Sequence, residues 1–270
     1  MQNTSQTERD ELVAAAVESA VFAAAQEIKR LFSFDSRPSG RDDIVSRIAH
    51  NDDVSMGILR ERLARALPSA RIVEDEMAIG RLPEGEWWII DPVEGAINQI
   101  HGMIEWCVTV TLVRDNELIL TAVHQGVTGD TYTARTGHGA YHNGKRLNVS
   151  AKTEIGSAMV GTGQARPGES VLTYERMGAS VTSMMQAALT VRVSVPATIQ
   201  LIQVAAGRMD GFWQFSQVLS GLASGALLVR EAGGVLTDVK GEPWTFDSET
   251  FLATSPALNP KMTSVLSQLV

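Results

Sequence analysis

The sequence has one cysteine, Cys107, and no apolar run long enough to cross a bilayer. A single thiol excludes an internal disulfide, which agrees with a reducing compartment. The Trp106–Val110 segment around this thiol reads as a buried strand, so we expect a packed, inert side chain. The N-terminus is polar and acidic and lacks the basic start of a signal peptide. We therefore expect a cytoplasmic protein that is not embedded in a membrane.

Positive charge is also scarce in this chain. Its 23 Lys and Arg residues are outnumbered by 31 Asp and Glu residues, which gives a net charge of −8. Nucleic acids and anionic membranes attract basic patches, so the balance argues against a partner of either kind. With 270 residues, the chain is long enough to bury a substantial core as one large domain or two closely joined ones.

The first third of the chain predicts two helices. Apolar residues recur at helical spacing from Glu8 to Phe34, which predicts a long amphipathic helix. The segment 36–43 is rich in Ser, Pro, Gly and charge and predicts a loop. A second helix is expected from Asp52 to Leu67, with Asp52 or Asp53 as its N-cap.

After Pro68 the pattern changes to short apolar segments separated by turn residues, and in the second half strands alternate with helices. This is an α/β pattern of layered sheets and helices. We expect an N-terminal α+β half (1–150) and a C-terminal α/β half (151–270) that form one compact unit. Segment 137–144 predicts a tight turn region, because it ends in Asn-Gly. The expected strands lie at 71–73, 87–90, 105–114, 117–125, 130–136, 158–162, 190–194, 211–215 and 234–238, and the later helices at 173–188, 197–207 and 220–232.

Acidic residues follow the first two predicted strands, at Glu74 and Asp91. Carboxylates at the ends of neighbouring strands converge at the edge of a sheet, where α/β proteins commonly bind ligands. Val93 offers a backbone carbonyl and Glu94 adds a carboxylate, and Mg²⁺ prefers such oxygen ligands. In the alternative interpretation, these acids are solvated strand ends and carboxylates that favour a helix start.

The residues after Glu94 predict an anion site. Gly95 and Ala96 open a short helix, and the free N–H groups at its start could hold a negatively charged group.

Several segments together resemble the inositol monophosphatase family. Residues 91–98, Asp-Pro-Val-Glu-Gly-Ala-Ile-Asn, resemble its motif Asp-Pro-(Ile/Leu/Val)-Asp-Gly-Thr-x-Asn, and Glu74 lies where the family has a glutamate metal ligand. Segments 137–144, 204–213 and 223–234 resemble three further family motifs in the correct order. The resemblance implies a five-layer αβαβα sandwich, usually a homodimer. It also implies Mg²⁺-dependent hydrolysis of a small phosphate monoester.

This chain departs from the family pattern at the metal ligands. The second family motif begins Trp-Asp, and the position of that aspartate ligand is Gly221 here. The second aspartate of the first motif is Glu94, which has the same charge and one more methylene. Mg²⁺ demands near-ideal octahedral geometry, so both changes affect the site. The resemblance then leaves Glu74, Asp91, the Val93 carbonyl and the altered Glu94 to hold one Mg²⁺.

The residues expected to touch substrate have changed as well. The motif threonine is Ala96, an acidic substrate contact aligns with Gln214, and a Gly-Ser/Thr pair aligns with Val195 and Pro196. Together with Gly221, these changes replace polar groups, so we expect a less charged and more apolar small-molecule ligand than a sugar phosphate.

Three functions remain open on the sequence. In the first, a repurposed enzyme uses Glu74, Asp91 and Glu94 for acid–base chemistry, because crowded carboxylates have raised pKa values. In the second, a phosphomonoesterase works with a reduced metal complement. In the third, the protein binds a ligand or regulates a partner without catalysis.

Overall fold

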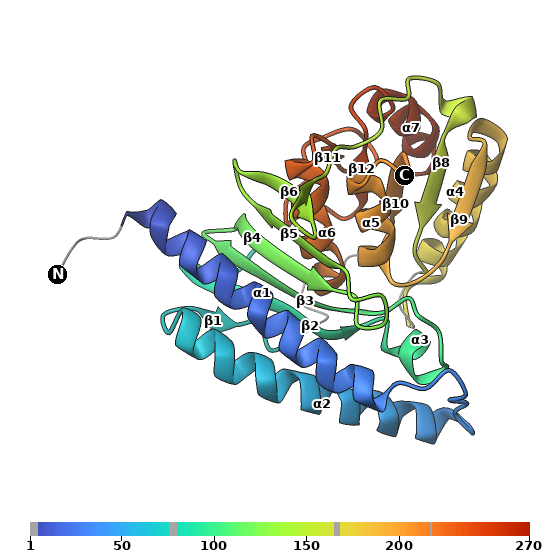
Figure 1. Cartoon of the computed structure of the whole chain (residues 1–270). Coiled ribbons are helices and arrows are strands. Elements are labelled where there is room, and N and C mark those ends of the chain that lie inside the picture. Colours follow the sequence, from blue (N-terminus) through green and yellow to red (C-terminus); the bar gives the residue numbers. More distant parts are fainter. Residues whose placement is uncertain (1–4, 76–79, 165–167, 217) are drawn as a thin grey trace.

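The computed structural model describes residues 5–75, 80–164, 168–216 and 218–270. Its elements form five layers, helix, sheet, helix, sheet, helix (Figure 1). Two N-terminal helices cover one face of a seven-stranded sheet, and a middle pair of helices fills the space between this sheet and a five-stranded one. Helices α4 (Val171–Ala187) and α7 (Asn259–Leu266) cover the outer face of the second sheet. The predicted αβαβα sandwich is confirmed.

The first sheet follows chain order and is antiparallel except for its first, parallel pair. The predicted strands are present, but the second strand continues past Asp91 to Glu94, with a bulge between these residues. A further strand lies inside segment 137–144, and the turn after it has positive φ at Asn143 and Gly144, as predicted for Asn-Gly. The strands are β1 (Arg71–Ile72), β2 (Glu86–Glu94), β3 (Cys107–Arg114), β4 (Glu117–His124), β5 (Thr131–Arg135), β6 (Gly139–His142) and β7 (Lys145–Arg146).

Helices α1 (Gln6–Leu31) and α2 (Arg41–Ala66) lie side by side across the first sheet (Figure 1). The long first helix is confirmed. The predicted start of the second helix was wrong, because α2 begins at Arg41 and Asp52 and Asp53 lie within it. The early turns of α2 are mostly exposed, and its buried residues begin at Asn51. The sequence therefore indicated only the part of α2 that packs on the sheet.

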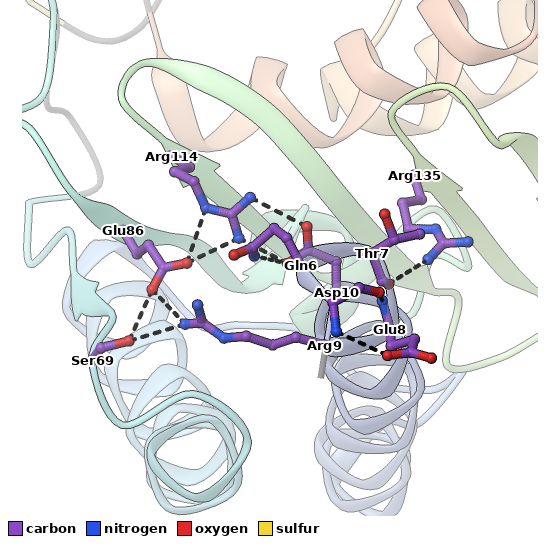
Figure 2. A network of polar contacts seen from close by, with 10 residues as sticks. Gln6, Thr7, Glu8, Arg9, Asp10, Ser69, Glu86, Arg114 and Arg135 are labelled. Atoms are coloured by element: carbon purple, nitrogen blue, oxygen red, sulfur yellow. Dashed lines mark hydrogen bonds and ion pairs between the residues drawn. The ribbon is translucent and has the colours of Figure 1, made fainter. Parts of the chain in front are cut away.

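A network of ion pairs fixes the start of α1 to the edge of the sheet (Figure 2). The Arg114 guanidinium on β3 donates to Asp10 Oδ1 at 2.7 Å and to Glu86 Oε1 at 2.9 Å. Arg9 and Ser69 donate to the second oxygen of Glu86, each at 2.8 Å. Charge-assisted bonds of this kind join α1, the end of α2 and two strands at one place.

The second sheet has the strand order β11-β12-β10-β8-β9. Its strands are β8 (Met159–Thr162), β9 (Thr190–Val193), β10 (Gly211–Gln214), β11 (Val235–Thr237) and β12 (Phe251–Thr254). The helices of this half are α4 (Val171–Ala187), α5 (Ala197–Ala205), α6 (Leu219–Glu231) and α7 (Asn259–Leu266), with single 3₁₀ turns at Ile155–Ser157 and Ser267–Leu269. The predicted elements are confirmed to within a few residues, while β12 and α7 were not predicted.

Helix α5 and helix α6 form the middle layer and pack against each other. Their apolar residues join both sheets in one core cluster, which includes Leu201, Phe212, Leu227 and Phe251. In the described part of the chain, no helix is both long enough and apolar enough to cross a membrane.

Candidate active site

The predicted site lies where β2 ends and the chain turns into the short helix α3 (Ala96–Ile100). Asp91 pairs with Thr109 of β3, and after a bulge Glu94 pairs with Cys107. Burial raises the pKa of the Cys107 thiol well above its ordinary value, and the charges of Glu94 and Asp91 raise it further. Both carboxylates therefore lie near this buried thiol, which agrees with a packed and inert cysteine.

Helix α2 supports this turn from behind with two buried polar side chains. Ser55 Oγ donates to the carbonyl oxygen of Pro92 at 2.6 Å, and Asn51 Nδ2 donates to Gln99 Oε1 at 2.7 Å. Neither residue was identified from the sequence. The available signal was a pair of polar residues, four positions apart, on the face of α2 that otherwise packs into the core.

Gly95 adopts a left-handed conformation, with φ of 84°, at the N-cap of α3. A Cβ atom there would lie 2.7 Å from the Glu105 carbonyl oxygen and 3.0 Å from Cδ of Pro196, so only glycine fits. Asn98 Nδ2 donates to the carbonyl oxygens of Glu105, at 2.8 Å, and Val195, at 2.9 Å. The structure thus brings Gly95, Val195 and Pro196 together, as the resemblance implied.

Ala96, the next predicted residue, is half-buried at the start of α3. It packs against an apolar cluster of Ile28, Val93 and Trp106. The side chain at this position thus contributes packing and no hydroxyl.

Glu94 and Gly221 are neighbours across the layer between β2 and α6. Glu94 is only 5% exposed, and a Cβ atom on Gly221 would lie 3.5 and 3.6 Å from its two carboxylate oxygens. The Gly221 carbonyl oxygen accepts a hydrogen bond of 3.1 Å from Thr198 Oγ1, which fixes α6 to α5. The Glu94 carboxylate therefore lies against the backbone from which the family's second-motif aspartate would project.

Glu74 follows β1 and has a different environment. Its side chain is 65% exposed, and both carboxylate oxygens contact the Arg60 guanidinium on α2, one of them at 2.8 Å from Arg60 Nη1. The hydrogen bond from Arg60 holds the pKa of Glu74 below its usual range. Glu74 thus faces Arg60, and its expected convergence with Asp91 and Glu94 into one ligand cluster stays a prediction. Among the described residues, no three His, Cys, Asp or Glu side chains are placed to hold a metal ion together.

The family's Mg²⁺ set therefore does not fit the described residues as they lie. Glu74 is engaged by a guanidinium, and Gly221 has no side chain to offer. Asp91, Glu94 and the Val93 carbonyl remain together on the β2 bulge. Their roles stay predictions.

Gln214 is the last residue of β10 and is buried. Its Nε2 atom donates to the Ser216 carbonyl oxygen at 2.7 Å, and Ser216 Oγ donates to Glu169 Oε1 at the same distance. Its Oε1 atom lies close to Gly163, where a Cβ atom would approach it to 2.9 Å. The Gln214 amide thus shapes the connection from β10 toward α6.

The layered fold, with two sheets enclosed by helices, defines the class of protein as a five-layer α/β sandwich. The model of the inositol monophosphatase family matches residues 8–270, and the chain belongs to this family.

Known proteins of similar sequence carry two different names, inositol-1-monophosphatase and Nus factor SuhB. The chain is 33% identical over 227 residues to an inositol-1-monophosphatase of Rhizobium meliloti, which covers 82% of this chain and 84% of the relative. It is also 33% identical over 185 residues to the Nus factor SuhB of Pseudomonas aeruginosa, covering 66% of this chain and 67% of the relative. Among solved structures, the extragenic suppressor protein SuhB of Bartonella henselae superposes with a TM-score of 0.81 at 25% identity, covering 96% of this chain and 99% of that one.

Proposed function

We propose that this family member is an enzyme that uses the Asp91 and Glu94 carboxylates for acid–base chemistry on a small, relatively apolar molecule. The observation that supports this most is the contact between Glu94 and Gly221. An aspartate at position 221 would place a second carboxylate beside Glu94. Two carboxylates so close together repel each other unless a cation lies between them. With glycine there, position 221 supplies no carboxylate that could share a cation with Glu94.

Glu94 suits a proton-transfer role because it is buried and rigidly placed. It follows the anchored Pro92 turn, lies opposite Cys107 on β3 and contacts the first turn of α6. A carboxylate held in a site of low polarity transfers protons more readily near neutral pH than a solvated one. Glu74, in contrast, is exposed and paired with Arg60, so we assign it no part in the proton transfer.

The surroundings support an apolar ligand. Ala96, Val195 and Pro196 replace hydroxyl-bearing or smaller residues of the family pattern, and Pro196 closes directly onto Gly95. These groups offer contact area and few hydrogen bonds. A ligand with little charge loses the least hydration free energy when it enters such a site.

The second candidate is a Mg²⁺-dependent phosphomonoesterase acting on a small phosphate ester with a reduced metal complement. Two observations favour it: Asp91 and Gly95 keep their family positions, and the Rhizobium meliloti relative is named for that activity. The Nus factor name of the Pseudomonas aeruginosa relative favours a third, non-catalytic role in regulating a partner. A homodimer, which the resemblance implies, stays part of each proposal.

The test uses three purified proteins, the wild type, Glu94→Gln and Glu74→Gln, with and without Mg²⁺. One panel holds inositol phosphates, nucleotides and sugar phosphates, and the other holds small apolar metabolites followed by mass spectrometry. We expect Mg²⁺-independent conversion in the second panel that Glu94→Gln abolishes and Glu74→Gln retains. Efficient Mg²⁺-dependent phosphate release would establish the second candidate, and no conversion by any protein would favour the third.

A further inference from the structure

A cavity of about 400 Å³ adjoins the candidate active site and shares Val195 with it. Its wall includes Asn98, Glu105 and Val195, the residues that join the Gly95 turn to the start of α5. The rest of the wall comes from the β4–β5 connection, from β9 and from α5 with the residues after it. None of the catalytic residues proposed above lines it.

Two arginines give this cavity its chemical character. Arg192 on β9 and Arg208 after α5 both line it and both are exposed. Within the described ranges of the chain, Arg192 makes no hydrogen bond or ion pair. Arg208 donates to Gln203 Oε1 at 3.3 Å and hydrogen-bonds the Tyr132 side chain, and both of these partners are neutral.

The cavity also contains two acids, whose surroundings differ. Asp130 Oδ1 accepts hydrogen bonds from His142 Nε2 at 2.8 Å and from Asn143 Nδ2 at 3.0 Å. Burial alone would raise the pKa of Asp130, but these hydrogen bonds outweigh it and lower the pKa. Asp130 is therefore already engaged with the β6 end of the hairpin. Asp130 stays ionised and, like Glu105, opposes an incoming anion, although its carboxylate is held by His142 and Asn143.

We propose that this cavity is a binding site for a small oxyanion, a phosphate or carboxylate group held between Arg192 and Arg208. A guanidinium presents a planar fork of donors that matches such groups. Gln203 lies in the same wall and offers a polar contact beside the charge pair. This site is independent of the chemistry proposed for Glu94, because it shares no ionisable group with it.

Titration calorimetry with inorganic phosphate and with malonate, at ionic strength held constant with chloride, tests the proposal and separates the two anion types. We expect Arg192→Gln and Arg208→Gln each to weaken binding of the preferred anion about tenfold, the loss of one charge-assisted contact. Glu105→Gln removes one of the two opposing charges, so it should strengthen binding severalfold. Arg62→Gln, an exposed arginine on α2, is the matched control and should bind as the wild type does.

Two results would overturn the proposal. One is the failure of the wild type to bind either anion. The other is phosphate binding that is unchanged in Arg192→Gln and Arg208→Gln but altered in Glu94→Gln, which would place the anion beside Gly95. Since the readout is binding and not turnover, its outcome is independent of whether the Glu94 proposal holds.

Discussion

The Glu94 carboxylate lies against Gly221, with both oxygens within 3.6 Å of the position that a Cβ atom on Gly221 would occupy. Two departures from the family pattern, more than a hundred residues apart in the sequence, thus meet at one contact. The Glu94 side chain, one methylene longer than the aspartate of the family motif, reaches helix α6 at the position where glycine replaces the family's second aspartate. We interpret the two substitutions as a coupled change, and the contact makes that interpretation testable.

Gly221→Ala should stabilise the protein by about 0.5–1 kcal/mol. The new methyl group would meet its neighbours at ordinary contact distances, 3.5 to 3.8 Å, and alanine is a better helix former than glycine within α6. Urea unfolding monitored by circular dichroism measures the change. A loss of more than about 1 kcal/mol would mean that the site has no room for a side chain.

Gly221→Asp should have the opposite effect in the absence of divalent cations. Its carboxylate would lie beside the buried Glu94, and this repulsion should cost about 2 kcal/mol relative to the near-isosteric Gly221→Asn. Mg²⁺ should recover the difference for Gly221→Asp alone, because a cation that binds only the folded state stabilises it. Equal responses of the two variants to Mg²⁺ would show that position 221 does not face a cation site.

Acid should weaken the anchorage of α1. Burial raises the pKa values of Asp10 and Glu86, but hydrogen bonds from Arg114, Gln6, Ser69 and Arg9 outweigh it, so both values lie below the ordinary 3.8 and 4.5. A carboxylate with a lowered folded-state pKa contributes stability above its unfolded-state pKa. That contribution is lost as the pH falls through the folded value. We therefore expect stability to fall steeply below about pH 4.

Arg114→Gln is the variant that isolates this effect. It should cost about 2 kcal/mol at pH 7, because it leaves two largely buried carboxylates with weaker partners. It should also flatten the acid dependence, since the remaining pKa values lie closer to their unfolded ones. Thermal unfolding between pH 3 and 7 gives both numbers, and parallel curves for the two proteins would contradict the assignment.

Cys107 should not react with thiol reagents in the folded protein at pH 8. Burial and the nearby Glu94 and Asp91 charges raise its pKa, so the reactive thiolate is not formed. The reagent should label one thiol per chain only after unfolding in guanidinium. Fast labelling of the native protein would show that the region around Cys107 and Glu94 opens readily to solvent.

The sequence predicted the fold well because its motifs and periodicities are local. The short helix that opens after Gly95 and the Asn143-Gly144 turn each follow from a few adjacent residues, whereas the bulge between Asp91 and Glu94 was not predicted. What it could not predict depends on tertiary contacts. The ion pair between Arg60 and Glu74 joins α2 to the end of β1, so the motif match alone placed Glu74 with Asp91.

The same limit explains the other differences. The first turns of α2 are mostly exposed, and its start was predicted eleven residues too late, at Asp52 in place of Arg41. From the sequence, Glu94 and Gly221 could be identified only as two separate departures from the family motifs. Their adjacency needed the packing of α6 on the first sheet.

A crystal structure of the protein soaked in Mg²⁺ tests the central claim most directly. If Glu94 has exchanged its role as one of several metal ligands for a role in acid–base chemistry, the structure will show at most one ion beside Asp91. Glu94 will then keep its contact with Gly221, and Glu74 will stay paired with Arg60. Two or more ions bridged by Asp91 and Glu94, with Glu74 turned from Arg60 to join them, would contradict the account and restore the phosphomonoesterase interpretation.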